Sequence, residues 1–239
     1  MSFKVINLVL LASLGAGSLE GQSFGSAVVS GPREILVGEP INQYSPGLVN
    51  IFRLENGQWR KVAALTAPEG HALDRFGRSL DMAGDRLLVG ATSIDDSTRG
   101  GAFLYERDRS GTWQLVTKLT PAGIGAGDAY GRAVRLNQDE AYVVSWGANQ
   151  GRGSISMWRR GANGQWTEAP AITASDGQQG NFFGSSISIS GNTMVVGAAQ
   201  KDTSRGSVYV FSREQPSGLW VEQARFRPAD MPAGASFGI

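Results

Sequence analysis

Short segments in which apolar and polar residues alternate make up most of the chain, a pattern typical of β-strands buried on one face. Four such segments of six to eight residues follow one another: 76–83, 86–92, 102–107 and 112–119. The pair Gly84-Asp85 separates the first two, and such residues tolerate the positive φ angles of a two-residue hairpin turn. This region therefore predicts four consecutive antiparallel strands and no helix.

The same order of segments returns along the chain with a period of 52 to 54 residues. An aromatic residue followed by Gly starts each unit, at Phe24-Gly25, Phe76-Gly77, Tyr130-Gly131, Phe183-Gly184 and Phe237-Gly238. A Trp lies 17 residues before each of the last four pairs, at Trp59, Trp113, Trp166 and Trp220. Each second strand ends in small residues, which we place at Gly38, Gly90, Ser145 and Gly197 and attribute to closely approaching backbones. Because these markers stay in phase, the sequence contains an internal repeat.

Repeated units of four strands predict an all-β chain, a β-propeller of four-stranded antiparallel blades that bury their faces on one another. The four complete repeats span residues 22–234, with blades at about 22–73, 74–127, 128–180 and 181–234. Residues 235–239 read as the start of an incomplete fifth repeat. Closure with four blades, an open arc or fragment of a longer propeller, and completion by self-association with another copy all stay open at this point.

The N-terminal segment has the features of a secretory signal peptide at residues 1–18, in which Lys4 precedes an apolar run at 5–14 and small residues follow. The alternative is that residues 5–13 form a buried strand in the last blade, since a short apolar run looks alike in both roles. The run is too short to cross a bilayer, so no transmembrane segment is expected. The leader predicts a secreted, cell-surface or periplasmic protein.

Composition narrows the range of functions. The chain has 22 Lys and Arg against 21 Asp and Glu, which leaves no basic footprint for nucleic acid. It has no Cys and a single His, His71, so thiolate chemistry and a multi-His metal site are excluded. His71 lies in a blade link near Asp74, where we expect a hydrogen-bonded turn. These observations predict no catalytic residue, no cofactor and no metal, and a protein that is not an enzyme.

The order of motifs resembles the FG-GAP repeat, the blade unit of the integrin α-subunit head and of many bacterial surface and secreted proteins. Phe-Gly, an apolar strand, a turn, Val-Gly-Ala, a loop and the strand 206–211 occur in this order in the fourth unit. The resemblance covers the chain after the leader and is weakest in the third unit, which has Ser145 and Trp146 in place of the small residues. It implies a propeller fold, and it implies no particular ligand because the motif residues are structural.

The calcium-binding members of this family carry an Asp-x-Asp-x-Asp-Gly-like loop between the first two strands of a blade. The corresponding hairpins here lie at residues 31–34, 84–85, 137–140 and 191–192. None offers three carboxylates at alternate positions, and calcium needs six to eight oxygens. We therefore expect no calcium at the family's position.

The strand order places all long polar loops on one side of the disc, which we call the long-loop face. It comprises the loops 40–47, 93–100, 147–153 and 200–206, and the links 66–74, 120–128 and 173–181. The opposite side, with the first and third hairpins of each blade, is the short-turn face. Long loops on a rigid scaffold often carry binding residues, and the integrin resemblance implies the same face. The candidate ligand contacts are Tyr44, Asp95, Asp96, Arg99, Trp146, Asn149, Arg152, Lys201, Asp202 and Arg205.

Each candidate also has a structural interpretation, because Asp and Asn stabilise their own turns and loop arginines are usually solvated. Trp146, aligned with Ala91 and Ala198, is expected either to plug the axial channel or to form a binding platform. The leading hypothesis is a non-enzymatic exported binding or adhesion module that engages a protein or glycan. The alternatives are a structural module without a ligand of its own and, third, an enzyme that uses the channel.

Overall fold

The computed structural model describes residues 23–41, 46–68, 70, 74–92, 100–125, 127–215, 217–227 and 229–239. The expected leader and the alternative strand at 5–13 lie outside the described residues. Within these residues sixteen strands form four antiparallel sheets of four strands each, which confirms the predicted all-β propeller blades. No helix in the described part is long and apolar enough to cross a membrane.

The strands of each blade pair in chain order. The first blade contains β1 (Ala27–Ser30), β2 (Glu34–Glu39), β3 (Leu48–Glu55) and β4 (Gln58–Leu65). The second contains β5 (Phe76–Ala83), β6 (Arg86–Ala91), β7 (Gly101–Arg107) and β8 (Trp113–Leu119). The third contains β9 (Tyr130–Leu136), β10 (Glu140–Ser145), β11 (Ser154–Arg160) and β12 (Trp166–Ile172). The fourth contains β13 (Phe183–Ser190), β14 (Thr193–Ala198), β15 (Ser207–Arg213) and β16 (Trp220–Phe226).

Alternation along the strands gives each inner blade two apolar faces. In β6, Leu87 and Val89 belong to the core shared with the first blade, whereas Leu88 belongs to the core shared with the third. All three side chains are fully buried. Burying an aliphatic side chain contributes about 1.5–3 kcal/mol, so packing between blades is the main source of stability.

Close approach between neighbouring blades explains two of the glycines that recur at one position of the repeat. A Cβ atom on Gly90 would lie 2.2 Å from the carbonyl oxygen of Gly131, and the same position in the fourth blade is Gly197. In the third blade the strand register places Val144 there, because it pairs with Ile155 as Gly90 pairs with Ala102. The expectation that Ser145 is the equivalent small residue is therefore wrong by one position.

Val144 is tolerated because its neighbour across the blade interface is Gly184. A Cβ atom on Gly184 would lie 2.5 Å from Val144 Cγ1. Gly184 also has a φ of 100°, a conformation that residues with a side chain rarely adopt. The missing side chain at Gly184 thus makes room for the larger residue opposite.

Two loops contain short helical segments that the sequence analysis did not expect: α1 (Ala148–Gly151) and α2 (Lys201–Ser204). Asn149 and Gln150 in α1 have φ angles of 55° and 64°, and Asp202 and Thr203 in α2 have 51° and 59°. Asn and Asp adopt this left-handed conformation more readily than other side chains. The prediction of no helix is corrected by these two turns, which shape the long-loop face.

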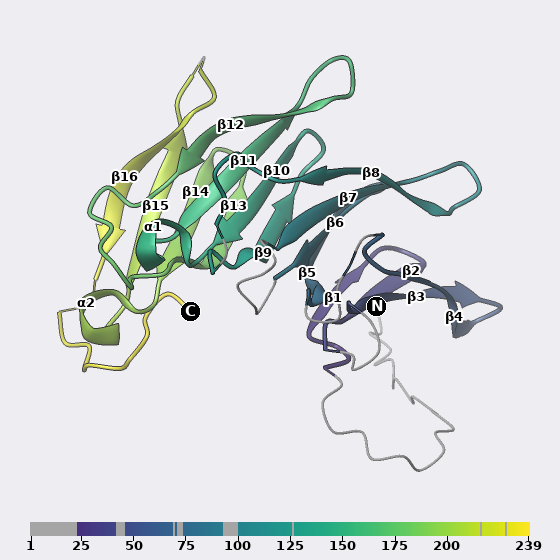
Figure 1. Ribbon diagram of the computed structural model, residues 1–239, viewed down its shortest axis with the longest axis horizontal. Coiled ribbons are helices and arrows are strands. Elements are labelled where there is room, and N and C mark those ends of the chain that lie inside the picture. Colours follow the sequence, from purple (N-terminus) through teal and green to yellow (C-terminus); the bar gives the residue numbers. More distant parts are fainter. Residues whose placement is uncertain are drawn as a thin grey trace, which may run out of the picture.

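The four blades fan out in an arc with the first and fourth blades at its ends (Figure 1). The end faces are more exposed than the equivalent faces between blades. Phe226 on β16 is 56% exposed, whereas the equivalent Leu119 on β8 is 2% exposed. At the other end Val28 on β1 is 57% exposed, whereas Leu80 on β5 is 7% exposed. Each end of the arc therefore presents an apolar sheet face.

Candidate functional site

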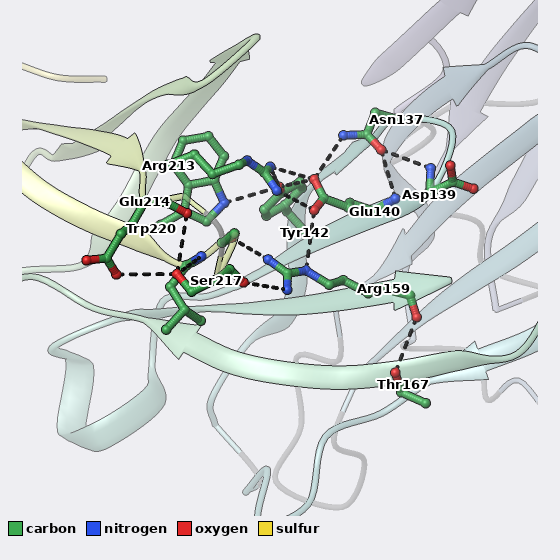
Figure 2. A network of polar contacts seen from close by, with 12 residues as sticks. Asn137, Asp139, Glu140, Tyr142, Arg159, Thr167, Arg213, Glu214, Ser217 and Trp220 are labelled. Carbon is green, nitrogen blue, oxygen red and sulfur yellow. Dashed lines mark hydrogen bonds and ion pairs between the residues drawn. The ribbon is translucent and has the colours of Figure 1, made fainter. Parts of the chain in front are cut away.

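A shallow depression of about 570 Å³ lies on the short-turn face between the third and fourth blades. Its lining residues are Asn137, Gln138, Asp139, Glu140, Arg159, Arg160, Gly191, Asn192 and Arg213. Figure 2 shows that Glu140 lies at the centre of a polar network that reaches across the blade interface. The depression is the first place to look for chemistry, because it gathers acidic and basic groups.

The charged groups of this network are paired with one another. Arg213 donates two hydrogen bonds of 2.6 Å to the Glu140 carboxylate and stacks 4.5 Å from the centre of the Trp220 ring. The Tyr142 hydroxyl donates to the Glu140 carboxylate at 2.7 Å, and Arg159 forms an ion pair with the same carboxylate at 3.4 Å. Burial alone would raise the pKa of Glu140, but the hydrogen bonds, chiefly from Arg213, outweigh burial and lower the pKa to about 2. Glu140 is therefore a poor proton donor or acceptor at neutral pH.

The same arrangement recurs between the first and second blades. Glu34, only 3% exposed, pairs with Arg53 and Arg107, each at 2.8 Å. The Trp113 indole N–H donates to Glu34 at 3.1 Å, and Arg107 stacks 4.6 Å from the centre of the Trp113 ring. Because both interfaces carry this Glu-Arg-Trp arrangement, we interpret it as a structural clamp between blades. The depression beside Glu140 is then a consequence of the clamp.

Of the candidate contacts predicted from the sequence, Tyr44, Asp95, Asp96 and Arg99 lie outside the described residues, as does His71. Asn149, Arg152 and Arg205 are exposed on the long-loop face, as expected. Their role as ligand contacts stays a prediction.

The side chain of Lys201 is not exposed, contrary to its expected position on an open loop. Lys201 is 4% exposed, and its ammonium group donates to the Asp176 carbonyl oxygen at 3.1 Å and to Asn181 Oδ1 at 3.2 Å. Asp202 pairs with Arg227. These contacts tie α2 to the neighbouring links, so Lys201 and Asp202 hold the loop in place.

Trp146 lies one residue later in the repeat than expected, because Ser145 ends β10 as Ala91 ends β6. Its indole N–H donates to the Gly184 carbonyl oxygen at 2.9 Å, and the ring packs beside Phe182 with 6.1 Å between ring centres. The Arg132 guanidinium lies 4.2 Å from the centre of the indole ring. Trp146 is therefore partly buried beneath Arg132. The two expected roles, channel plug and binding platform, stay predictions.

Arg132 belongs to a group of arginines that the sequence analysis missed, together with Arg75 and Arg78. Arg78 and Arg132 each follow the aromatic-Gly pair at the start of an inner strand, on β5 and β9, and Arg75 directly precedes the pair on β5. These strand starts lie beside the long loops, since the Phe76 amide donates to the Pro46 carbonyl oxygen. We call these three residues the inner arginine cluster. The signal in the sequence is that blades one and four have Ser26 and Ser185 at this position.

Among the described residues no group of three or more His, Asp or Glu side chains comes together as a metal site would. In the third blade, where two acids are adjacent in the hairpin, Asn137 Oδ1 instead accepts the backbone amides of Asp139 and Glu140. This is an ordinary turn stabilised by its own side chain. The absence of calcium stays a prediction.

Comparison with known proteins supports the repeat and the fold. Residues 59–105 and 166–211 match the FG-GAP repeat model. No curated protein sequence matches the chain. A crystal structure of a protein from Lactobacillus plantarum has a TM-score of 0.61 at 13% identity, covering 86% of this chain and 57% of its own. The chain thus spans little more than half of that protein's length.

A second solved structure, the periplasmic gluconolactonase of Pseudomonas aeruginosa, aligns over 85% of this chain and 72% of its own at 12% identity, with a TM-score of 0.44. This finding corrects the expectation that the protein is not an enzyme: the structures that resemble this chain include one described as an enzyme. At this similarity the comparison assigns no activity and no catalytic residue to the chain.

Proposed function

We propose that the chain is a binding module that engages a protein or a glycan through its long-loop face, since two of its segments match the FG-GAP repeat and its sheets are propeller blades. We propose further that it is exported, on the basis of the leader-like sequence at residues 1–18. Adhesion to a cell surface is one form that such binding would take.

The observation that carries the proposal is a difference between the two faces. On the short-turn face, the charges of the depression neutralise one another across the blade interface, as Glu140 and Arg213 do. Near the long-loop face, the inner arginine cluster has no ion pair with any described residue. Positive charge that pairs with no described carboxylate, held on a rigid scaffold, is a common feature of recognition surfaces, and blade packing does not explain it.

The loops beside the cluster add accessible polar groups. Asn149 and Gln150 are exposed on α1, and Arg152 follows directly. Asn149 has a left-handed backbone in this turn, and Ala148 and Gly151 on either side of the exposed residues are buried. Such a loop presents hydrogen-bond donors and acceptors while the strands beneath hold its ends.

A structural module with no ligand of its own is the second candidate, and the exposed end faces favour it. Phe226 and Val195 on the fourth blade are 56% and 36% exposed, at positions where the second blade buries Leu119 and Leu88. A module that packs against further blades, or against another copy, would use such faces. Self-association through them is part of this alternative.

The test compares binding of two matched triple variants on a glycan array and to a panel of purified surface proteins. One variant changes Asn149, Arg152 and Arg205 to Ala on the long-loop face. The control changes Asn192, Arg33 and Arg109 to Ala on the short-turn face, which removes the same residue types and the same charge. All six residues are exposed, so both variants should keep the fold.

We expect wild type and the control to bind and the long-loop variant to lose at least about tenfold in affinity, since contacts with charged groups are usually worth that much. Circular dichroism and the melting temperature verify that each variant is folded. Loss of binding in the control alone would show that the other face is the binding face. No binding by the wild-type protein would favour the structural module.

A further inference from the structure

The inner arginine cluster places three positive charges at the starts of the inner strands of two adjacent blades. The strands β5 and β9 are neighbours, and the Ser79 hydroxyl on β5 donates to the Gly131 carbonyl oxygen on β9 at 2.9 Å. Arg78 precedes Ser79 and Arg132 follows Gly131, so this contact brings together the strand starts that carry the two arginines. The Arg78 amide also donates to the Arg75 carbonyl oxygen at 3.1 Å, which closes the turn between these residues.

These arginines differ from the other arginines near blade interfaces. Arg53, Arg107 and Arg213 each pair with a carboxylate in the inter-blade clamps. No described carboxylate forms an ion pair with the cluster. All three side chains are partly buried, which reduces their contact with water.

Like charges held together in a partly buried place are costly. Burial, and then the charge of Arg78, lower the pKa of Arg75. Burial, and then the charges of Arg78 and Arg75, lower the pKa of Arg132. Both directions mean that the surroundings disfavour the positive charge. A bound anion would relieve this repulsion.

One guanidinium is fixed in position. Arg132 stacks 4.2 Å from the centre of the Trp146 ring, and the hydrogen bond from Trp146 to Gly184 holds that ring. Stacking uses the flat face of a guanidinium and leaves the N–H groups at its edge available. These N–H groups suit two oxygens of one anion, as in bidentate arginine contacts.

The repeat itself shows that the arginines are not required by the blade. At the position of Arg78 and Arg132, the first and fourth blades have Ser26 and Ser185. Each serine hydroxyl donates to a carbonyl oxygen three residues before it, Ser26 to Ser23 at 2.7 Å and Ser185 to Phe182 at 2.9 Å. These hydrogen bonds let the serines stabilise their own turns. The blade therefore does not require an arginine at this position.

We propose that Arg75, Arg78 and Arg132 form a binding site for an oxyanion, a sulfate, phosphate or carboxylate group, beside Trp146 at the inner edge of the long-loop face. The inference rests on the proposed function in that it names the chemical class of ligand for the same face. The oxyanion can be a free inorganic ion or a group carried by a sugar.

The experiment measures binding of sodium sulfate, sodium phosphate and sodium glucuronate by isothermal titration, with sodium chloride at equal ionic strength as the reference. The wild-type chain is compared with the Arg78→Ser, Arg132→Ser double variant, which introduces the residues of the other two blades. The Arg109→Ser variant is the control for loss of charge, because Arg109 is exposed on the short-turn face. An Arg132→Lys variant keeps the charge and removes the bidentate geometry, should the double variant fail to fold.

We expect wild type and Arg109→Ser to bind at least one of these anions, with chloride too weak to compete. We expect the affinity to fall by about tenfold or more in the double variant, and to fall in Arg132→Lys as well. Tighter binding of glucuronate than of sulfate and phosphate identifies a sugar-borne group, and the reverse identifies a free inorganic ion. Equal affinity in wild type and double variant, or no binding by wild type, overturns the site. The triple-variant comparison on the array still tests the proposed function in that case.

Discussion

At the scale of single residues, Glu140 shows how pairing across a blade interface converts charge into stability. Its pKa is lowered from 4.5 to about 2, because hydrogen bonds from Arg213, Tyr142 and Asn137 outweigh the effect of burial. A carboxyl group with a lower pKa in the folded state stabilises the protein wherever it is ionised. This contribution is complete above about pH 4.5 and is lost as the pH falls toward 2.

We therefore predict that Glu140→Gln lowers the free energy of unfolding by about 2–3 kcal/mol at pH 7, and by progressively less between pH 4.5 and pH 2. Urea unfolding of wild type and variant over this pH range is the measurement. Asp139→Asn is the control, since Asp139 is an exposed neighbour and should change stability by less than about 0.5 kcal/mol. A difference between wild type and Glu140→Gln that stays constant over this range would contradict the clamp.

The glycine at the blade interface gives a second prediction at this scale. Gly90→Val should lower the free energy of unfolding by several kcal/mol, because its Cβ atom would lie 2.2 Å from the Gly131 carbonyl oxygen. Gly125→Ala is the control, because its Cβ atom would meet only an ordinary contact at 3.5 Å. Melting temperatures compare the two variants. An unchanged melting temperature for Gly90→Val would mean that the blades do not approach as described.

Residue positions within the repeat could be predicted only in part. The crowding at Gly90 and Gly197 could be expected from their place in the repeat. The third blade misled the alignment, because Val144 fills the crowded position and depends on Gly184 of the next blade. That compensation links residues of two different repeats, and a comparison of repeats one by one does not show it.

At the scale of elements, strands and hairpins could be predicted well from alternation and turn residues, since both are local properties. The turns α1 and α2 could not, because they depend on left-handed residues such as Asn149 and Asp202 and on contacts with distant links. The burial of Lys201 could not be predicted either, because it depends on contacts with a distant link. Its partners Asp176 and Asn181 belong to the link that precedes the blade.

Equivalent positions on β8 and β16 give a prediction that compares an inner blade with an end blade. Leu119→Ala should cost about 2–4 kcal/mol of unfolding free energy, because Leu119 is 2% exposed in the core between blades. Phe226→Ala should cost less than about 1 kcal/mol, because Phe226 is 56% exposed. Chemical denaturation of both variants and the wild type at two protein concentrations measures the change in unfolding free energy. A cost for Phe226→Ala as large as that for Leu119→Ala, and dependent on concentration, would show that another copy covers the end face.

At the scale of the whole molecule, the architecture follows from a period of 52 to 54 residues and from the alternation within it. The candidate site does not follow in the same way. The long loops drew attention to residues such as Lys201. The charges that form no ion pair with a described residue lie instead at the starts of the inner strands, at Arg78 and Arg132. Only the fold shows that these arginines are neighbours with Arg75 and that Trp146 lies beneath one of them.

The central claim is that the two faces differ in function, and hydrogen–deuterium exchange with and without the tightest-binding ligand of the array tests it most directly. We predict that the ligand slows exchange in residues 147–153 and 200–206 and at the starts of β5 and β9, and leaves the hairpins at 137–140 and 191–192 unchanged. Each segment reports locally, because opening of loops is largely independent of global unfolding. Slower exchange confined to the two hairpins, with no change at the long loops, would contradict the account.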